Sequence, residues 1–364
     1  MNRKVRTALV GCGKVAHLHA AALGALPEAE FVAVTDAAFE RAREFAARYR
    51  VQPYPDLESL IENAQVEAVI VCTPHPVHRA PAVRAAEASV HVLVEKPLAS
   101  SLSDCDAMIE AAARHNVKLG VVSQRRFFEP VARMKAAIDA GKIGAPVLGT
   151  VAMFSWRDAD YYRSDPWRGK WDTEGGGVLI NQSPHHLDIL QWLMGPIEEI
   201  TGNYANLNHP YIEVEDTAMA MIRFRSGALA SVVVSLSQKP GIYTKIHVHG
   251  ANGASVGAET DSGATFIAGM TAVAAPPLND LWTIPGEESL LPAFQEEDRA
   301  AFRLIDPGTH YHAAQDRDFL RAILEDRPPL VTGGEGRKVV EMIAAIYRSA
   351  RQRGPVRLPL QDLE

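Results

Sequence analysis

Short apolar runs alternate with longer helical patterns through the first third of the chain. The apolar runs lie at residues 5–10, 31–35, 66–72, 90–94 and 117–122, and helical patterns separate them at 16–26, 39–48, 76–88 and 102–115. Strands that are buried on both faces appear as continuous apolar runs, and helices between such strands indicate parallel βαβ units. This pattern predicts an N-terminal doubly wound parallel α/β sheet of the Rossmann type.

The pattern changes after about residue 124. Long β-branched runs follow at 146–155, 217–224, 229–237 and 245–249, and a helical pattern lies at 184–194. Consecutive strands of this kind predict an open, mostly antiparallel sheet in an α+β domain. The segment 269–306 is rich in Pro, Glu and Asp, so we expect it to be irregular and partly exposed. A final helix is expected at about 336–351.

The length of 364 residues exceeds what one hydrophobic core usually serves, so two domains are expected. The first would cover residues 1–123 and the second residues 124–364. The last helix could pack back on the first domain.

A glycine turn follows the first predicted strand and opens the first predicted helix. Gly11 suits a tight turn, Gly13 allows a close approach of backbone to a pyrophosphate, and Ala16 lets helix and strand pack closely. Lys14 and Val15 lie in the same turn. The amino terminus of the helix would face the phosphates with its unpaired N–H groups. The turn therefore predicts a dinucleotide-binding site.

Asp36 ends the second predicted strand, about twenty residues after the glycine turn. A carboxylate there can accept hydrogen bonds from the adenosine ribose hydroxyls and repel a 2′-phosphate, which predicts NAD as the cofactor in preference to NADP. The alternative is that Asp36 only caps the helix that begins near Phe39.

Two further strand ends carry polar side chains. The run 90–94 leads directly into Glu95, Lys96 and Pro97, and the run 66–72 leads into Thr73 and Pro74, with His75 and His78 close behind. Ligands bind at the carboxyl ends of the strands in open α/β sheets, so Lys96 is a candidate for chemistry. The alternative is a solvated lysine at a strand end.

A third cluster lies on and before the helical pattern at 184–194. It begins with three glycines at 175–177 and continues to Asn181, Ser183 and His185. Ser183 is a natural N-cap residue, and Pro184 suits the first helical turn. These caps place His185 in the first turn of the helix.

Two neighbours of His185 suggest different roles. Asp188 lies three residues later and would either orient the imidazole or pair with a neighbouring basic residue. Adjacent helical residues project about 100° apart, so His186 should face elsewhere. For that reason, and because no other ligand set is evident, we predict no metal site.

The stretch 156–169 is dense in aromatic and guanidinium groups. Aromatic faces stack on sugar C–H surfaces and arginines bind anions or hydroxyls, so Tyr161, Arg163, Trp167 and Arg168 are candidate ligands of substrate or cofactor. An exposed interface loop is the alternative. Arg126, at the junction between the predicted domains, is expected to be structural.

The Glu95-Lys96-Pro97 motif, together with the glycine turn and the 175–188 cluster, resembles the Gfo/Idh/MocA family of oxidoreductases over nearly the whole chain. The resemblance implies that Lys96 is catalytic, that Glu95, Thr73, Pro74 and the Trp167–Arg168 pair lie on the cofactor side, and that His185 is the family histidine. Asn181 stands where the family has an aspartate. An asparagine can hydrogen-bond a substrate hydroxyl but cannot accept a proton.

The resemblance implies an NAD-dependent dehydrogenase that oxidises a secondary hydroxyl of a sugar, anhydrosugar, inositol or glycoside. Lys96 would act as general base with His185 as its partner, and Asn181 and Tyr161 would contact the substrate. The alternatives are a redox-neutral, NAD-dependent glycosidase and a non-catalytic sugar sensor. By resemblance, a homodimer or homotetramer is expected.

The composition narrows the class of protein further. A net charge of -7 disfavours a nucleic-acid partner, and no run of about eighteen apolar residues indicates a membrane span. The apolar stretch near the amino terminus breaks too early for a signal peptide. The three cysteines are far apart in the sequence, so a reduced, cytoplasmic location is expected.

Overall fold

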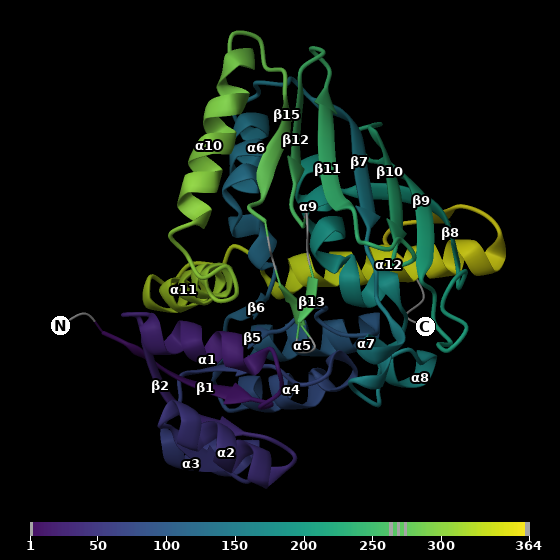
Figure 1. Cartoon of the computed structure of the whole chain (residues 1–364). Helices are drawn as coiled ribbons and strands as arrows, with labels where there is room; N and C mark the ends of the chain where they lie inside the picture. The colour runs from purple at the N-terminus through teal and green to yellow at the C-terminus, as the bar shows by residue number, and fades with distance from the viewer. Residues whose placement is uncertain (1–2, 262–264, 268–269, 273–274, 361–364) are drawn as a thin grey trace. The chain divides into compact units, whose positions relative to one another are not determined.

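The computed structural model describes residues 3–261, 265–267, 270–272 and 275–360. The chain divides into two compact units. Met1–Gln124 and Gly308–Val340 form the first, and Arg125–Pro307 and Glu341–Leu363 form the second. Figure 1 labels the elements of both.

The first unit contains a six-stranded parallel sheet in the order β3-β2-β1-β4-β5-β6. Its strands are β1 (Val5–Val10), β2 (Ala29–Thr35), β3 (Gln52–Tyr54), β4 (Ala68–Val71), β5 (His91–Val94) and β6 (Leu119–Val121). Its helices are α1 (Ala16–Ala25), α2 (Phe39–Tyr49), α3 (Leu57–Ala64), the 3₁₀ turn η1 (His75–Val77), α4 (Arg79–Glu87) and α5 (Leu102–Arg114). The predicted parallel Rossmann sheet is confirmed. The short β3 and α3 were not predicted.

A helix from late in the chain completes this unit. Phe319 and Leu320 of α11 (His310–Leu324) pack in the same apolar cluster as Leu9 of β1 and Leu23 of α1. The segment Gly308–Val340 therefore belongs with the first unit, whereas the predicted division assigned it to the second. The helical pattern of this segment predicts an apolar face but does not indicate which of the two sheets that face covers.

The second unit contains a mixed sheet in the order β15-β12-β11-β7-β10-β9-β8-β16, in which only the β7–β10 pair is parallel. Its strands are β7 (Pro146–Phe154), β8 (Ile197–Ala205), β9 (Thr217–Phe224), β10 (Leu229–Ser235), β11 (Tyr243–Gly250), β12 (Ser255–Glu259), β15 (Leu278–Trp282) and β16 (Val356–Arg357), with β13 (Thr265–Ile267) and β14 (Met270–Ala272) as a separate pair. The predicted open, mostly antiparallel sheet is confirmed.

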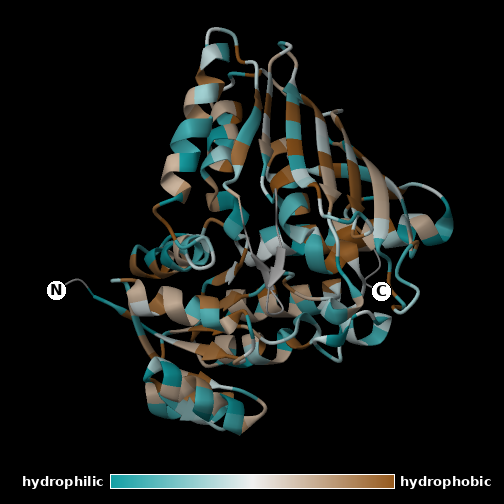
Figure 2. Ribbon diagram, viewed as in Figure 1, coloured by the Kyte–Doolittle hydropathy of each residue, from teal (hydrophilic) through white to brown (hydrophobic). Residues whose placement is uncertain are grey.

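Most of the remaining helices lie in this unit, and several pack on one face of the sheet. In chain order the helices are η2 (Gln124–Phe127), α6 (Glu129–Asp139), α7 (Ala159–Arg163), α8 (Trp171–Glu174), the π-helical turn η3 (Val178–Gln182), α9 (Pro184–Met194), η4 (Glu288–Leu290), α10 (Leu291–Phe302) and α12 (Gly333–Gln352), of which η2 and α12 begin in the first unit. Of these, α9 packs on β7 and β11, and α6 packs on β12 and β15. Buried and exposed positions alternate along β9, as expected for a sheet with one covered face. Figure 2 shows hydrophobic and hydrophilic residues on the strands of this sheet.

The expectation of an irregular segment at 269–306 is wrong for much of its described part. Strand β15 joins the large sheet, and α10 runs for twelve residues. Residues 269, 273 and 274 lie outside the described residues. Phe294 of α10 packs edge-on against Trp282, and Arg133 lies over the Phe294 ring. These tertiary contacts stabilise a helix whose proline and acidic residues resemble loop composition. No helix among the described residues has the length and apolar character needed to cross a membrane.

Candidate functional site

Four of the predicted residues lie at the carboxyl ends of neighbouring strands in the first unit. Gly11 follows β1, Asp36 follows β2, Thr73 follows β4 and Lys96 follows β5, and these strands are adjacent in the order β2-β1-β4-β5. Helices connect β1 to β2 on one side and β4 to β5 on the other, so the order reverses between β1 and β4. Open α/β sheets bind ligands at such a switch point.

The glycine turn after β1 has the expected backbone. Gly11 has a φ of +96°, and a Cβ built there would lie 2.9 Å from the carbonyl carbon of Cys72. Any larger residue would push the turn away from the end of β4. A Cβ on Gly13 would meet no described atom within 4 Å, so this side of the turn is open. Helix α1 begins at Ala16, directly behind it.

Asp36 is tied to the glycine turn. Its Oδ2 accepts a hydrogen bond of 2.8 Å from the Cys12 backbone N–H, and its Oδ1 accepts one of 2.8 Å from Ala38 N–H. Helix α2 begins with Ala38 as its N-cap, without a side-chain cap. The carboxylate therefore joins the ends of β1 and β2 rather than acting as the N-cap of α2.

His78 links two turns rather than pointing outward. Its Nε2 lies 2.8 Å from the carbonyl oxygen of Thr73, and its Nδ1 lies 3.1 Å from that of Pro97. Burial lowers the pKa of this imidazole. The ring thus connects the Thr73-Pro74 turn to the segment that carries Lys96. The hydroxyl of Thr73 is buried and has no hydrogen-bond partner among the described residues.

Glu95 is buried and Lys96 is half-buried. The Glu95 Oε2 accepts a hydrogen bond of 2.9 Å from the backbone N–H of Lys96, and its Oε1 lies 3.1 Å from Nε2 of His19 on α1. Burial opposes ionisation of Glu95, but His19 outweighs it and lowers the pKa of the carboxyl to about 2. His19, three residues after Ala16 on α1, was not predicted from the sequence to lie beside the site.

In the second unit, the glycine run is fixed by a buried carboxylate. Glu215, just before β9, accepts hydrogen bonds from Gly177 N–H (2.9 Å), Leu179 N–H (3.0 Å) and the Tyr347 hydroxyl (2.9 Å). A Cβ on Gly177 would lie 1.9 Å from the Glu215 carbonyl oxygen, so only glycine fits. This contact positions η3, which carries Asn181.

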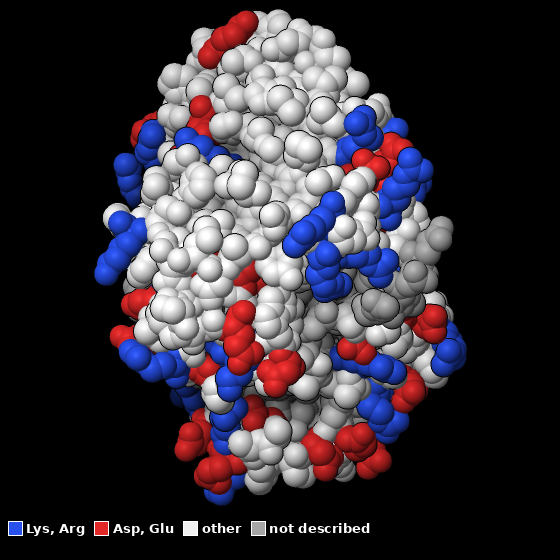
Figure 3. Space-filling model, turned by 90° about the vertical axis from the view of Figure 1, so that its right-hand side faces the viewer, with Lys and Arg blue, Asp and Glu red and all other residues white. Residues whose placement is uncertain are grey.

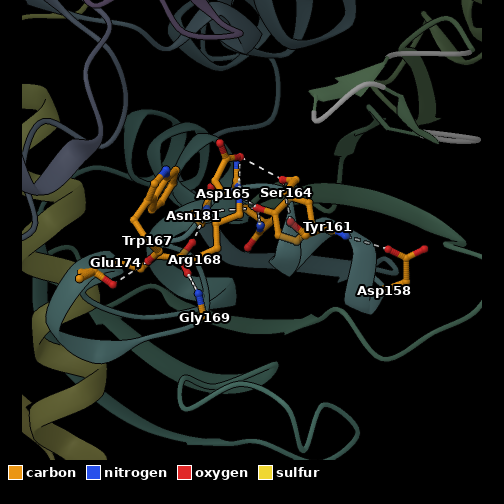
Figure 4. A network of polar contacts seen from close by, with 11 residues as sticks. Asp158, Tyr161, Ser164, Asp165, Trp167, Arg168, Gly169, Glu174 and Asn181 are labelled. Carbon is orange, nitrogen blue, oxygen red and sulfur yellow. Dashed lines mark hydrogen bonds and ion pairs between the residues drawn. The ribbon is translucent and has the colours of Figure 1, made fainter. Parts of the chain in front are cut away.

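Asn181 belongs to a polar network built from three neighbouring segments (Figure 4). Its amide Nδ2 donates to the hydroxyl of Tyr161 at 3.2 Å and also to Oε1 of Glu174. Glu174 is buried, and its Oε2 accepts the Gly169 N–H at 2.5 Å. The Glu174 carboxylate therefore contacts Asn181, the residue that stands where the family pattern has an aspartate.

Tyr161 is the centre of this network. Its hydroxyl accepts hydrogen bonds from Arg168 and, at 2.8 Å, from Gln182. The Arg168 guanidinium also lies 4.4 Å from the Tyr161 ring centre and 4.5 Å from that of Trp167. These predicted residues come together. Arg163 does not join them, because its side chain is 73% exposed and pairs with Asp160.

His185 lies buried in the first turn of α9, as predicted, but its expected cap is absent. Ser183 is the N-cap residue of α9, as predicted, but it has helical backbone angles and its hydroxyl donates to the Leu179 carbonyl at 2.9 Å. The expected capping hydrogen bond from its side chain is therefore absent.

The two neighbours of His185 have partners of their own. Asp188 forms a two-point ion pair with Arg126, at 2.7 and 2.5 Å. Of the two roles left open for Asp188, the structure therefore favours pairing with a basic residue. His186 points to Thr260 and Asp261, at 3.0 and 3.1 Å.

The first unit fits a bound dinucleotide on its own geometry. The open side of Gly13 leaves room for a phosphate beside the amino terminus of α1, the Asp36 carboxylate stands at the next strand end, and the buried Thr73 hydroxyl lacks a protein partner among the described residues. NAD would be held by these groups.

Comparisons with known proteins agree with this geometry. Residues 5–123 match the model of an oxidoreductase family with an NAD-binding Rossmann fold, and residues 131–256 match the GFO/IDH/MocA C-terminal domain. Myo-inositol 2-dehydrogenase of Thermotoga maritima is 31% identical over 68% of this chain and 74% of its own length. The scyllo-inositol 2-dehydrogenase (NAD(+)) of Bacillus subtilis is 31% identical over 70% of this chain and 73% of its own.

A solved structure resembles the chain over almost its full length. The WlbA dehydrogenase from Bordetella pertussis, crystallised with NADH and UDP-GlcNAcA, has a TM-score of 0.86 and 29% identity, and the match covers 99% of each chain. Together with the two family models, these similarities show that the chain belongs to the Gfo/Idh/MocA family of oxidoreductases with an NAD-binding Rossmann fold.

Proposed function

We propose that this protein is an NAD-dependent dehydrogenase that oxidises a secondary hydroxyl of a polyhydroxylated ring, either a sugar or a cyclitol. The observation that carries the proposal is Lys96, held at the carboxyl end of β5, at the same sheet edge as the glycine turn. A lysine at that edge can serve dinucleotide chemistry, because this is the edge where such ligands bind.

Lys96 is the proposed general base. NAD, when bound, accepts the hydride that leaves the carbinol carbon. The neutral amine of Lys96 takes the hydroxyl proton at Nζ as the carbonyl forms, and returns it when the reaction runs in reverse. Glu95 supports this role by holding the backbone N–H of Lys96.

His185 is the proposed second catalytic group, and Asn181 and Tyr161 are proposed substrate ligands. The hydrogen bonds from Asn181 to Glu174 and Tyr161 fix the amide, which then can orient a substrate hydroxyl but cannot take its proton. We assign the proton to Lys96, with His185 as its partner. Arg163 is a weaker candidate for the substrate because it is exposed and paired with Asp160.

NAD is the proposed cofactor in preference to NADP. Asp36 keeps both oxygens at the strand end beside the glycine turn, where a negative charge attracts ribose hydroxyls and repels a 2′-phosphate. Gly11, Gly13, Lys14, Val15, Ala16, Thr73, Pro74 and Glu95 are the other proposed contacts in the first unit, and Trp167 and Arg168 are those in the second.

Two substrate groups are supported by the relatives. The two inositol 2-dehydrogenases match 68% and 70% of this chain, and the WlbA dehydrogenase, which was crystallised with NADH and UDP-GlcNAcA, covers 99% of it. We propose the full-length match as the better guide, so UDP-GlcNAcA stands first in the test panel.

The test follows the formation of NADH by absorbance while the purified protein meets NAD and a panel of compounds. The panel holds UDP-GlcNAcA, myo-inositol, scyllo-inositol, levoglucosan and simple glycosides. Growth of NADH with one compound supports the dehydrogenase and names its substrate class. Release of an aglycone without net formation of NADH would contradict the dehydrogenase and support the redox-neutral glycosidase. Binding of both NAD and sugar without any product would favour a sensor.

We also propose that the protein is a homo-oligomer that pairs through the uncovered face of its large sheet. Met219 and Met221 of β9 are 56% and 68% exposed, and Leu229 of β10 and Leu148 of β7 continue the apolar surface across neighbouring strands. Figure 3 shows a large area without charged side chains on the side of the molecule that carries β8, β9 and β10. Apolar patches of this kind mark protein interfaces.

A further inference from the structure

A buried chain of hydrogen bonds lies behind the segment that carries Lys96. His19 on α1 has no solvent exposure, and each of its ring nitrogens faces a carboxylate. The Nδ1 lies 2.9 and 3.0 Å from the two oxygens of Asp316, and the Nε2 lies 3.1 Å from Oε1 of Glu95. The imidazole therefore bridges two acids that come from distant parts of the sequence.

The chain of contacts ends on the backbone of Lys96. The second oxygen of Glu95 accepts the Lys96 N–H at 2.9 Å, so the carboxylate joins His19 to the residue proposed as the base. A carboxylate with fixed partners on both oxygens cannot rotate without breaking one of them. The direction in which Lys96 leaves the strand end is thereby tied to His19.

Histidine suits this position for a chemical reason. A protonated imidazole donates from two opposite ring edges, which places one donor on Asp316 and one on Glu95. Burial by itself would lower the pKa of His19, but the two carboxylates outweigh burial and raise it to about 10. Hydrogen bonds between charged partners are shorter and stronger than neutral ones, so the protonated His19 holds the two carboxylates in place.

We propose that His19, supported by Asp316, is a positioning residue that fixes the Glu95 carboxylate and through it the backbone of Lys96. The inference rests on the proposed function, in which Lys96 is the general base. His19 does not take part in proton transfer with the substrate; its effect on turnover passes through Glu95 and Lys96.

Hydrogen exchange tests the inference without substrate or cofactor. In His19→Gln, the backbone amide of Lys96 should exchange at least about tenfold faster than in the wild type, because its acceptor loses a charged partner. Peptides that contain Lys96 report this change by mass spectrometry. His17→Gln is the matched control: it lies on the same helix, but its Nδ1 contacts the Tyr49 hydroxyl at 2.8 Å. That variant should exchange at the wild-type rate.

Turnover gives a second readout that a purely structural role would not move. His19→Gln should lower kcat about tenfold or more, while KM and the Kd of NAD stay close to the wild type. Unchanged exchange and unchanged kcat in His19→Gln would overturn the inference. Retained activity in Lys96→Ala would instead contradict the proposed function. Because exchange at Lys96 is measured without substrate, the failure of the His19 inference can be told apart from the failure of the proposed function.

Two further measurements keep the test decisive. Should His19→Gln not fold, Asp316→Asn keeps the shape of the acid and removes its charge. This variant should show a smaller increase in exchange and a smaller decrease in kcat.

The ligand atoms of His19, Glu95 and His312 all lie within 4.8 Å of one another, close enough to surround a metal ion. One tightly held metal ion per chain, found by elemental analysis, would overturn the positioning role; a metal-free active protein supports it.

Discussion

At the scale of single residues, the proposed base is the first position to test. Replacement of Lys96 by Ala should lower kcat by at least about a hundredfold, because the hydroxyl proton loses its acceptor. The Kd of NAD, measured by fluorescence, should stay within about twofold, since the glycine turn and Asp36 are unchanged. Lys118→Ala, which removes a lysine paired with Asp326 in the same unit, is the control and should keep full activity. Retained turnover in Lys96→Ala would refute the assignment.

Asp36 governs the choice of cofactor in this proposal. Asp36→Asn keeps an acceptor for the Cys12 N–H and removes the charge, so the preference of kcat/KM for NAD over NADP should fall by about tenfold or more. Steady-state kinetics with both cofactors measure the ratio. Glu40→Gln, at an exposed position in the first turn of α2, should leave it unchanged. A wild-type enzyme that uses both cofactors equally well would contradict the prediction.

The buried bridge at His19 makes a prediction about pH and stability. Since Asp316 and Glu95 raise the pKa of His19 to about 10, the folded state holds this proton more tightly than the unfolded chain, in which histidine titrates near 6.5. The contribution of the His19 proton to the free energy of unfolding is complete below about pH 6.5 and is lost as the pH rises through about 10. The contribution of Glu95 is complete above about pH 4.5 and is lost as the pH falls toward about 2. Glu95 therefore stays ionised throughout the titration of His19.

Urea unfolding at a series of pH values measures this effect. The stability advantage of the wild type over His19→Gln should be largest just below pH 6.5 and should shrink toward pH 10. His17→Gln should follow the wild-type pH dependence between about pH 7 and 9, where His17 is neutral in both the folded and the unfolded state. Among the described residues, the charged or titratable groups that contact the ring are Glu95, Asp316 and His312, and the buried Cys72 thiol lies in the field of the two carboxylates. An advantage that does not vary with pH would show that His19 is held neutral.

At the scale of elements, one buried ion pair joins the start of the second unit to α9. Asp188 and Arg126 are almost without exposure, and Arg126 also lies over the Trp192 ring at 4.7 Å. Asp188→Ala leaves the guanidinium buried and unpaired, so the free energy of unfolding should fall by about 3–5 kcal/mol. Urea unfolding measures it. Asp172→Ala, at an exposed position of α8, should change it by less than about 0.5 kcal/mol.

The alternative role of Asp188 gives the opposite pattern. If Asp188 orients His185 rather than anchoring Arg126, Asp188→Ala should lower kcat and leave the free energy of unfolding near the wild-type value. That result would contradict a structural role for the Asp188–Arg126 pair.

Several elements show how far the pattern of residues predicts local structure. Strand β9 and helix α9 occur where the periodicity placed them, because an alternating strand and a helix with Pro184 at its start each have a strong local signal. Helix α10 was missed because its acidic residues and Pro292 resemble a loop, and its stability comes from Trp282 and Arg133. Ser183 is the N-cap residue of α9 as predicted, but its side chain does not cap the helix, because its hydroxyl donates to the Leu179 carbonyl.

At the scale of the whole molecule, the uncovered sheet face predicts self-association. Met221→Glu places a charge at the centre of the apolar surface formed with Met219, Leu229 and Leu148, so the oligomer should dissociate or weaken at least about tenfold. Size-exclusion chromatography with light scattering measures the mass. Leu304→Glu, at a highly exposed leucine outside this sheet, is the control and should keep the wild-type mass. A wild-type protein that is monomeric at all concentrations would contradict the proposal.

The sequence alone determined the parts of this protein that depend on local patterns. The glycine turn, Asp36, Thr73 and Lys96 each follow an apolar run, and parallel strands bring their ends to one edge, so their shared location in the first unit followed from the order of elements. The family membership rests on the same short motifs and is borne out by the two family models.

Only the tertiary structure decided which distant side chains support these motifs. Asp316 lies nearly three hundred residues from His19 in the chain, yet α11 packs on the first unit and places its carboxylate against that imidazole. Glu174 likewise supports Asn181, and Glu215 fixes the glycine run, through contacts that no spacing in the sequence indicates. Buried polar groups must find hydrogen-bond partners, and packing, which periodicity does not encode, decides which partners are within reach.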